Sequence, residues 1–356
     1  MKKTWIAHFG ILAGLLTIVI HFIAGLGFEL QFFEFYHLWI FPVVRIIYDY
    51  TFGLIPVPVI YVLFLILVYF GVLNIYRAVK KYGEMSLRAW ILNGLIFWLN
   101  FLGTTIFLFY FLWGFNYYRP SIEEQLRLAD VHIDSTGLLN EYINLTNELM
   151  HERKAITSDS SELQGILNWG EIENDIRDVQ EDLLTSWGDH IHGRVRVRRL
   201  FPQGMLLRIS TAGVYIPFVS EGHIDPGMHS IQWPFTAAHE MAHGYGYTDE
   251  GVCNFIGLLT CLKSENHFIR YSGLLGYWRY LFYELRERYP DEAKVQYKML
   301  DAGVKNDLSA IRQALDRYPD VLPMLRDLIY DSYLKSHGVQ KGLKSYNDIV
   351  IQMIKW

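Results

Sequence analysis

The first third of the chain contains three apolar runs, and each of them is long enough to cross a lipid bilayer. They cover about residues 5–28, 55–76 and 89–114, and none of them contains an Asp, Glu, Lys or Arg. About 20 apolar residues span the ~30 Å hydrocarbon core of a membrane. A buried helical core is the alternative, but three uncharged runs of this length favour membrane spans. The composition, 51% hydrophobic and 16% aromatic, agrees with this interpretation.

The segment between the first two runs has a different character. Residues 35–55 are aromatic but also contain Arg45 and Asp49. Aromatic side chains with occasional charges are typical of the membrane–water interface. We therefore expect an interfacial segment there rather than a fourth span.

Basic residues predict how the chain is oriented in the membrane. Lys2 and Lys3 precede the first run, and four more basic residues lie in the loop Arg77–Arg88 between the second and third runs. Loops on the cytoplasmic side carry an excess of Lys and Arg. With three crossings, the amino terminus then lies in the cytoplasm and everything after Gly114 lies on the outer side.

A change of character near Pro120 predicts a membrane domain of residues 1–118 and a second domain of residues 119–356. Ser121 and Glu124 form a capping-box pattern that predicts the start of a long amphipathic helix. Alternating, β-branched segments follow further along the chain and predict a small sheet, and the remainder is helical in pattern. The expected fold class is therefore α+β, mainly helical, after three amino-terminal transmembrane helices.

Residues His239 to His243 form an H-E-x-x-H motif in a segment that begins near Pro234 and has a helical pattern. Four residues turn about 400° and rise about 6 Å along an α-helix, so both imidazoles face the same way. Two nitrogen ligands at this separation suit a tetrahedral zinc ion. Glu240 lies about 100° round the helix, where its carboxylate can reach a metal-bound water rather than the metal.

A catalytic zinc ion needs a third protein ligand, and the sequence offers two acids. Asp249 ends the pattern H-E-x-x-H-x-x-G-x-x-D, in which Gly246 lets the chain turn back toward the metal. Glu250 precedes Asn254 by one helical turn, and that asparagine can hydrogen-bond an imidazole or the carboxylate. The spacing alone leaves both acids as candidates.

Several segments resemble a bacterial membrane family that is known as a domain of unknown function and looks like a gluzincin metallopeptidase. The resemblance covers most of the chain and rests on WGFNYYRPSIEEQL, GVYIPFVSEGHID, HEMAHGYGYTDEGVCNFIGLLTC and YLKSHGVQKGLKSYNDIV. It implies a zincin-like domain in which zinc is bound by His239, His243 and Glu250. It also implies that Glu240 is the general base and that Asn254 supports the ligands.

The chain departs from the family pattern directly after Glu250. The usual motif resembles H-E-L-A-H-x-x-G-x-x-x-E-D-E-A-N-F, whereas this chain has Gly251, Val252 and Cys253 in place of D-E-A. The absence of the second carboxylate removes one rival ligand. Taken with the resemblance, it selects Glu250 as the third ligand.

Together these features predict a zinc metallopeptidase in the bacterial inner membrane, with its catalytic domain on the periplasmic side. A zinc-activated water, deprotonated by Glu240, would attack the peptide bond. The expected partners are a peptide or protein substrate and the lipid bilayer; no basic patch indicates nucleic acid.

An inactive zincin domain that binds or senses is the alternative. An intramembrane protease is disfavoured because the motif lies about 125 residues beyond the last apolar run.

Two further roles have candidates in the sequence. The segment Gly213–Val219 is predicted to be an edge strand that pairs with an extended substrate, the alternative being an ordinary sheet strand. An oxyanion donor is expected in such a site. Tyr271, His267 and Tyr346 are candidates, each with a purely structural role as the alternative.

Overall fold

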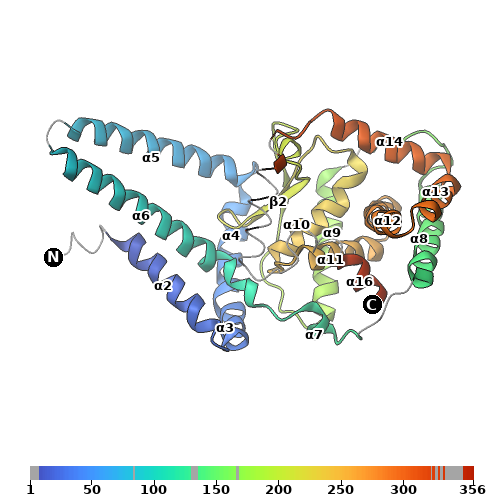
Figure 1. The fold of residues 1–356 in the computed structure, drawn as a ribbon, viewed down its shortest axis with the longest axis horizontal. Helices are drawn as coiled ribbons and strands as arrows, with labels where there is room; N and C mark the ends of the chain where they lie inside the picture. The colour runs from blue at the N-terminus through green and yellow to red at the C-terminus, as the bar shows by residue number, and fades with distance from the viewer. Residues whose placement is uncertain are drawn as a thin grey trace. The chain divides into compact units, whose positions relative to one another are not determined.

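The computed structural model of the 356-residue chain describes residues 8–82, 85–129, 135–165, 168–321 and 348–356, together with 323, 324, 328 and 332. The chain divides into two compact units, whose elements are labelled in Figure 1. The first unit comprises Met1–Arg119 and Ile216–Ser220. The second comprises Pro120–Tyr215 and Glu221–Trp356.

The elements described in the amino-terminal part of the first unit, up to Arg119, are helices. They are α2 (Phe9–Ala24), α3 (Glu29–Phe35), the π-helical turn η1 (Tyr36–Ile40), α4 (Phe41–Tyr50), the 3-10 turn η2 (Phe52–Leu54), α5 (Val59–Tyr82), α6 (Leu87–Leu112) and the 3-10 helix η3 (Gly114–Tyr118). Three helical runs are long and apolar enough to cross a membrane: Glu29–Leu54, α5 and α6. The last two overlap the predicted runs at 55–76 and 89–114, with α5 displaced a few residues toward the carboxyl terminus. These three helices are compatible with a membrane protein.

Two expectations for the start of the chain need correction. The predicted run at 5–28 appears as α2, a shorter apolar helix of 16 residues within the part of the chain that is described. Residues 35–54 of the segment expected at the interface instead belong to the helical run Glu29–Leu54, which is long and apolar enough to cross a membrane. The physical reason is that Arg45 and Asp49 lie one helical turn apart and form a buried ion pair of 2.7 Å. Their charges therefore compensate each other within an apolar helix.

Helices α2 and α6 pack closely because glycines lie at their contact. A Cβ atom on Gly103 would overlap the carbonyl oxygen of Gly10, and one on Gly14 would lie 2.6 Å from the Cα atom of Gly103. Small residues allow helices in lipid to approach until their backbones touch. The side chain of Asn100 also accepts a hydrogen bond of 3.3 Å from the backbone N–H of Ile11.

The second unit is mostly helical with a small sheet, as expected. Its helices are α7 (Ile122–Leu126), α8 (Ser135–Ile156), α9 (Trp169–Ser186), α10 (Trp233–Gly244), α11 (Glu250–Lys263), α12 (His267–Arg288), α13 (Pro290–Met299), α14 (Ala302–Asp316) and α16 (Asp348–Lys355). Its strands are β1 (Val197–Arg199), β2 (Gly213–Ile216) and β3 (Glu221–Ile224), in the order β1-β3-β2. Strand β1 runs parallel to β3, with Val197 opposite Gly222.

The predicted long helix after Ser121 is divided in the structure. The capping box is present, because the hydroxyl of Ser121 accepts a hydrogen bond from the backbone of Glu124, whose carboxylate accepts one from the backbone of Ser121. However, α7 ends at Leu126, because Arg127 takes a left-handed conformation with a φ of 52°. The longer helix α8 starts separately at Ser135.

Helix α10 lies at the centre of the second unit. Its side chains Ala237, Ala238, Met241 and Ala242 are fully buried, and it packs against β3, α9, α11 and α12. Glycines bring its neighbours close: a Cβ atom on Gly257 of α11 would lie 3.1 Å from the backbone nitrogen of His239. The polar residues that α10 carries in its second half are therefore buried as well.

Candidate metal centre

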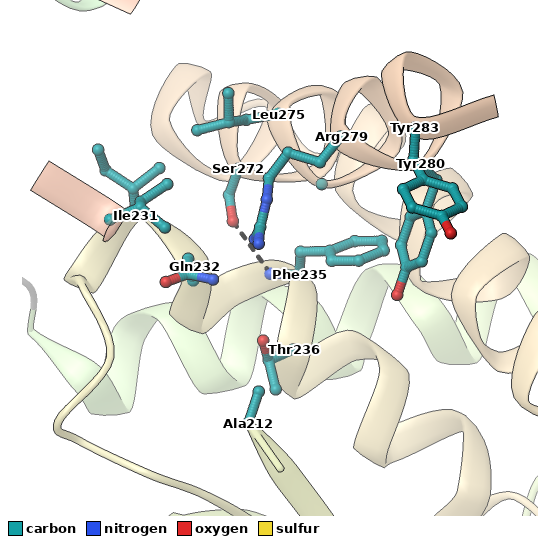
Figure 2. A pocket seen from close by; sticks show the side chains of 12 residues that line it. Ala212, Ile231, Gln232, Phe235, Thr236, Ser272, Leu275, Arg279, Tyr280 and Tyr283 are labelled. Carbon is teal, nitrogen blue, oxygen red and sulfur yellow. Dashed lines mark hydrogen bonds between the residues drawn. The ribbon is translucent and has the colours of Figure 1, made fainter. Parts of the chain in front are cut away.

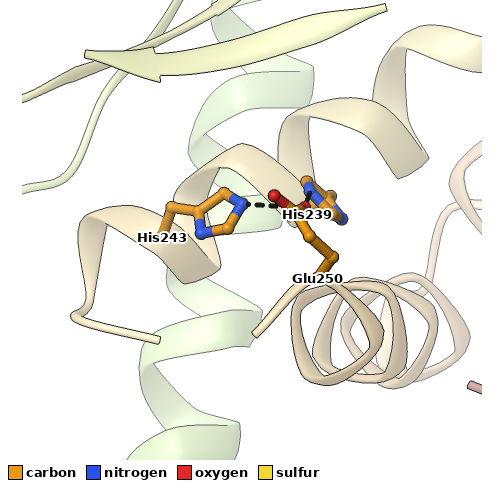
Figure 3. A group of neighbouring side chains, drawn as sticks. All are labelled: His239, His243 and Glu250. Atoms are coloured by element: carbon orange, nitrogen blue, oxygen red, sulfur yellow. Dashed lines mark hydrogen bonds and ion pairs between the residues drawn. The ribbon is translucent and has the colours of Figure 1, made fainter. Parts of the chain in front are cut away.

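The two histidines of the motif lie one turn apart on α10, and a glutamate from α11 meets them (Figure 3). The chain turns back after α10 through Gly246, which has a φ of 89°, a conformation that favours glycine. The Nε2 atoms of His239 and His243 lie 3.1 and 3.3 Å from the same oxygen, Oε2 of Glu250. Potential ligand atoms of the three residues all lie within 4.8 Å of one another.

Asp249 and Glu250 have different positions at the start of α11. Asp249 is the N-cap of this helix, and its carboxylate accepts a hydrogen bond of 3.0 Å from the backbone N–H of Val252. Glu250 is the first residue of the helix, and its side chain points to the histidines. The structure thus brings Glu250 to the histidines, while Asp249 satisfies a backbone donor at the helix end.

Both imidazoles are held by oxygen acceptors on the side away from Glu250. Nδ1 of His239 lies 2.8 Å from Oδ1 of Asn254, the residue that the sequence marked as a supporting group. Nδ1 of His243 lies 2.9 Å from the carbonyl oxygen of Tyr247. Because Nδ1 donates to these oxygens, the Nε2 lone pairs face the space beside Glu250, as in protein sites that bind a metal through histidine.

Two contacts of His243 could not be predicted from the sequence. The carbonyl of Tyr247 belongs to the backbone, and any residue type provides such an acceptor. The thiol of Cys253 lies 3.3 Å from Nδ1 of the same imidazole and is fully buried. Burial raises the pKa of Cys253 to about 11, so this thiol stays neutral beside the ring.

Glu240 lies between the helix and the sheet. A Cβ atom built on Gly213 of β2 would lie 2.5 Å from Oε1 of Glu240. A Cβ atom built on Gly222 of β3 would lie 2.9 Å from the Cβ atom of Glu240. Its Oε2 is buried and has no hydrogen-bond partner among the residues that the structure describes. Burial raises the pKa of Glu240 to about 7, against the opposing effect of the two imidazoles. This carboxyl group can therefore accept and release a proton near neutral pH.

Glu250 has the opposite tendency. Burial alone would raise its pKa, but His243 and His239 outweigh burial and hold the pKa well below its usual range. The group is therefore a buried carboxylate that positive charge stabilises. A divalent cation is one way to supply that charge in a site lined by two imidazoles.

The predicted oxyanion donors are engaged elsewhere. The hydroxyl of Tyr271 donates to Asp307 over 2.8 Å, and Nδ1 of His267 lies 2.8 Å from the carboxylate of Glu152. Tyr346 lies outside the described residues. The structure therefore does not bring the first two candidates to the histidines.

Tyr280 of α12 is instead a neighbour of the site. Burial raises the pKa of Tyr280 and is the largest cause of the shift. The charge of Arg279 and the side chain of Asn254 lower this pKa, and the carboxylate of Glu250 raises it. The hydroxyl therefore stays protonated and able to donate a hydrogen bond. Sequence reasoning missed Tyr280 because α12 is a separate helix, and no fixed spacing from the motif indicates which of its residues faces the site.

The strand expected to pair with substrate lies at an edge of the sheet. Strand β2 is shorter than the predicted segment Gly213–Val219, because residues 217–220 form a turn. It begins with Gly213, which also faces the carboxylate of Glu240. An edge strand therefore starts next to the motif helix.

The sequence matches one protein family over residues 36–354, which includes η1 and both helices of the centre. The chain belongs to the family DUF3810. This family is described as proteins of unknown function. No curated protein and no solved structure matches the chain.

Proposed function

We propose that the chain is a membrane-anchored zinc metallopeptidase. Its zinc ligands are His239, His243 and Glu250, and Glu240 is the general base. One observation carries the proposal: two imidazoles of α10 and the carboxylate of Glu250 on α11 offer ligand atoms within 4.8 Å of one another, and α10 also carries Glu240, whose carboxylate is buried with an unsatisfied oxygen. A purely structural metal site has no use for such a glutamate. The resemblance of the motif to gluzincins points the same way.

The donor set fits zinc. Two imidazole nitrogens and one carboxylate oxygen are the protein ligands of many catalytic zinc sites, which keep a fourth position for water or substrate. Asn254 and the Tyr247 carbonyl orient the imidazoles, a task that such outer groups perform in metal sites. The two thiols of the chain are not in the ligand group, which agrees with a hydrolytic rather than an all-thiolate structural site.

The chain's own residues supply the remaining chemistry of peptide hydrolysis. When bound, zinc would act as a Lewis acid toward water and the scissile carbonyl. Glu240 accepts the proton of the attacking water and returns it to the leaving amine. Tyr280 donates a hydrogen bond to the oxyanion. The edge of β2 aligns the substrate by main-chain pairing, which accepts peptides with little demand on their side chains.

The second unit is proposed to lie on the periplasmic side of the inner membrane. The basic loop Arg77–Arg88 connects α5 to α6, and the positive-inside rule places that loop in the cytoplasm. Helix α6 is long enough to cross and leads directly into the second unit. This orientation depends only on the loop and on α6, so it holds for any number of crossings before them.

The test compares the full-length wild type with Glu240→Gln, both purified in detergent and loaded with zinc. We expect hydrolysis of a mixed peptide library to fall about 10²–10⁴-fold in the variant, the usual loss when a general base is removed. Bound zinc, measured by metal analysis, should stay the same. Glu265→Gln makes the same chemical change at an exposed position and should retain activity. Zinc retention without cleavage by the wild type, on a broad library, would instead indicate an inactive zincin domain that binds or senses.

A further inference from the structure

A pocket of about 540 Å³ lies in the second unit, beside the first half of α10 (Figure 2). One face of α12 forms a wall of this pocket, with residues spaced three or four apart along the helix. These residues are Ser272, Leu275, Gly276, Arg279, Tyr280 and Tyr283. Ile231 and Gln232 just before α10, Phe235 and Thr236 near its start, Ala212 before β2 and Ile311 of α14 complete the lining.

Three connections link the pocket to the metal centre. Thr236 lines the pocket and lies one helical turn, about 6 Å, before Glu240 on α10. Ala212 also lines it and directly precedes Gly213, which faces the Glu240 carboxylate. Tyr280 lines it and interacts with Asn254, the partner of His239. A substrate side chain held in the pocket therefore has its backbone next to Glu240.

Arg279 is the single charged residue among the twelve that line the pocket. Figure 2 shows its side chain extending from α12 toward the start of α10. It is exposed and forms no ion pair or hydrogen bond within the described part of the chain. Other arginines of the unit do have acidic partners: Arg153 with Asp307, Arg177 with Glu173, Arg198 with Glu221, and Arg270 with Glu152.

Two polar groups lie near the guanidinium. The side-chain carbonyl of Gln232 is buried without a hydrogen-bond partner among the described residues, and it can accept from an N–H group of a ligand but not bind a carboxylate. The hydroxyl of Ser272 accepts a hydrogen bond of 3.1 Å from the backbone of Phe235, which leaves its own hydrogen available to a ligand. Figure 2 shows both side chains on the Arg279 side of the pocket, whereas Tyr280 and Tyr283 lie on the other side.

We propose that this pocket binds a carboxylate of the peptide substrate through Arg279, next to the bond that is cleaved. The proposal rests on the proposed peptidase function and adds a substrate class to it. A guanidinium presents parallel N–H donors that match a carboxylate, and such charge-assisted pairs are stronger than neutral hydrogen bonds. The carboxylate has two sources, an Asp or Glu side chain or the carboxyl terminus of the peptide.

Four fluorescent pentapeptides separate these sources. They are Ala-Ala-Phe-Glu-Ala amide, its Gln counterpart as amide, the same Gln peptide with a free carboxyl terminus, and Ala-Ala-Phe-Lys-Ala amide. Binding is measured by fluorescence anisotropy to the full-length, zinc-loaded Glu240→Gln protein in detergent, so that hydrolysis does not interfere. We expect the Glu peptide or the free-acid peptide to bind about tenfold or more tightly than the neutral Gln amide.

Arg279 is then varied in the same Glu240→Gln protein. Arg279→Gln should remove the preference for a carboxylate, and Arg279→Glu should shift the preference to the Lys peptide. Arg288→Gln, which makes the same change near the exposed end of α12, should keep the preference. Thermal unfolding checks that each variant is folded.

Equal binding of all four peptides, or a carboxylate preference that survives both Arg279 substitutions in folded protein, would overturn the proposal. A preference for the Glu peptide identifies a side-chain carboxylate, and a preference for the free acid identifies the chain end. Because binding is measured without turnover, failure of the wild type to hydrolyse any peptide would refute the peptidase function and leave the pocket assignment intact.

Discussion

The two units distribute apolar and charged side chains in opposite ways. In the first unit, only 6% of the residues in the most apolar stretch of α5 and 11% of those in the corresponding stretch of α6 are buried, so large hydrophobic side chains face outward. In the second unit, Glu240, Glu250, His239 and His243 are each less than 9% exposed. Exposed apolar surface is unfavourable in water, and buried charge is unfavourable in a protein interior. This contrast supports the two partners proposed above, lipid around the first unit and a cation inside the second.

Glycine serves close approach in both units, with different results. In the first, Gly10, Gly14 and Gly103 allow two apolar helices to touch. In the second, Gly213 and Gly222 bring the sheet against Glu240. The glycine contact in the first unit joins α2 and α6 directly through their backbones. The contact in the second unit excludes water from the Glu240 carboxylate, and this burial raises its pKa. The predictions below test this contrast from the largest expected effect to the smallest.

The largest effect is expected from the removal of the buried charge that faces the histidines. Glu250→Ala should weaken zinc binding by more than about 100-fold, because loss of a ligand exceeds the 10–100-fold loss typical of outer groups. Asp249→Ala should leave zinc affinity nearly unchanged and lower stability by about 1 kcal/mol, the usual effect of losing an N-cap. Competition with a zinc chelator measures both affinities. Unchanged affinity in Glu250→Ala would contradict the ligand assignment.

A smaller effect is expected from the group that orients one imidazole. Asn254→Ala should reduce zinc affinity about 10–100-fold, because His239 loses the partner that fixes its ring. The matched control is Asn306→Ala, at an exposed asparagine of α14. Chelator competition with both variants gives the ratio. An affinity equal to that of the control would show that Asn254 does not orient the ligand.

In the first unit, the corresponding test changes a glycine at the helix contact. Gly103→Val should destabilise the α2–α6 pair by about 1–3 kcal/mol, the usual cost of overpacking. Gly94→Val is the control on the same helix, since a Cβ atom there meets nothing within 4 Å. Thermal unfolding in detergent, with zinc content measured alongside, compares the two. Equal unfolding temperatures would mean that the close approach does not stabilise the unit.

The mildest perturbation is a change of pH. A general base must be ionised, so activity should be present above the pKa of Glu240 and fall tenfold per unit below it. That pKa is about 7 with burial as its main cause. A bound cation favours the carboxylate, so the midpoint in the zinc-loaded enzyme should lie at or below this value. A profile of kcat/KM against pH, with zinc content checked at each point, tests the sign. Activity that increases as the pH falls through this range would contradict the assignment.

Local patterns were sufficient for several parts of the structure. The helical spacing of His239 and His243, the start of their helix near Pro234 and the position of Asn254 one turn after Glu250 all follow from periodicity within one element. Patterns failed where one residue changed the course of the chain. The amphipathic pattern predicted that the helix continues past Arg127, but the helix ends there. An arginine in the sequence gives no indication that its backbone will take a left-handed conformation.

The amino-acid sequence by itself determined the apolar helices, the motif helix and the pair of acids from which a third ligand would come. These depend on residues within one or two turns of each other, where backbone geometry alone sets which side chains share a face. Tertiary structure decided that Glu250 points to the histidines while Asp249 caps a helix. It also placed Tyr280 and Arg279 in a pocket beside the start of the motif helix, because the packing of α12 against α10 depends on the whole core rather than on any local spacing.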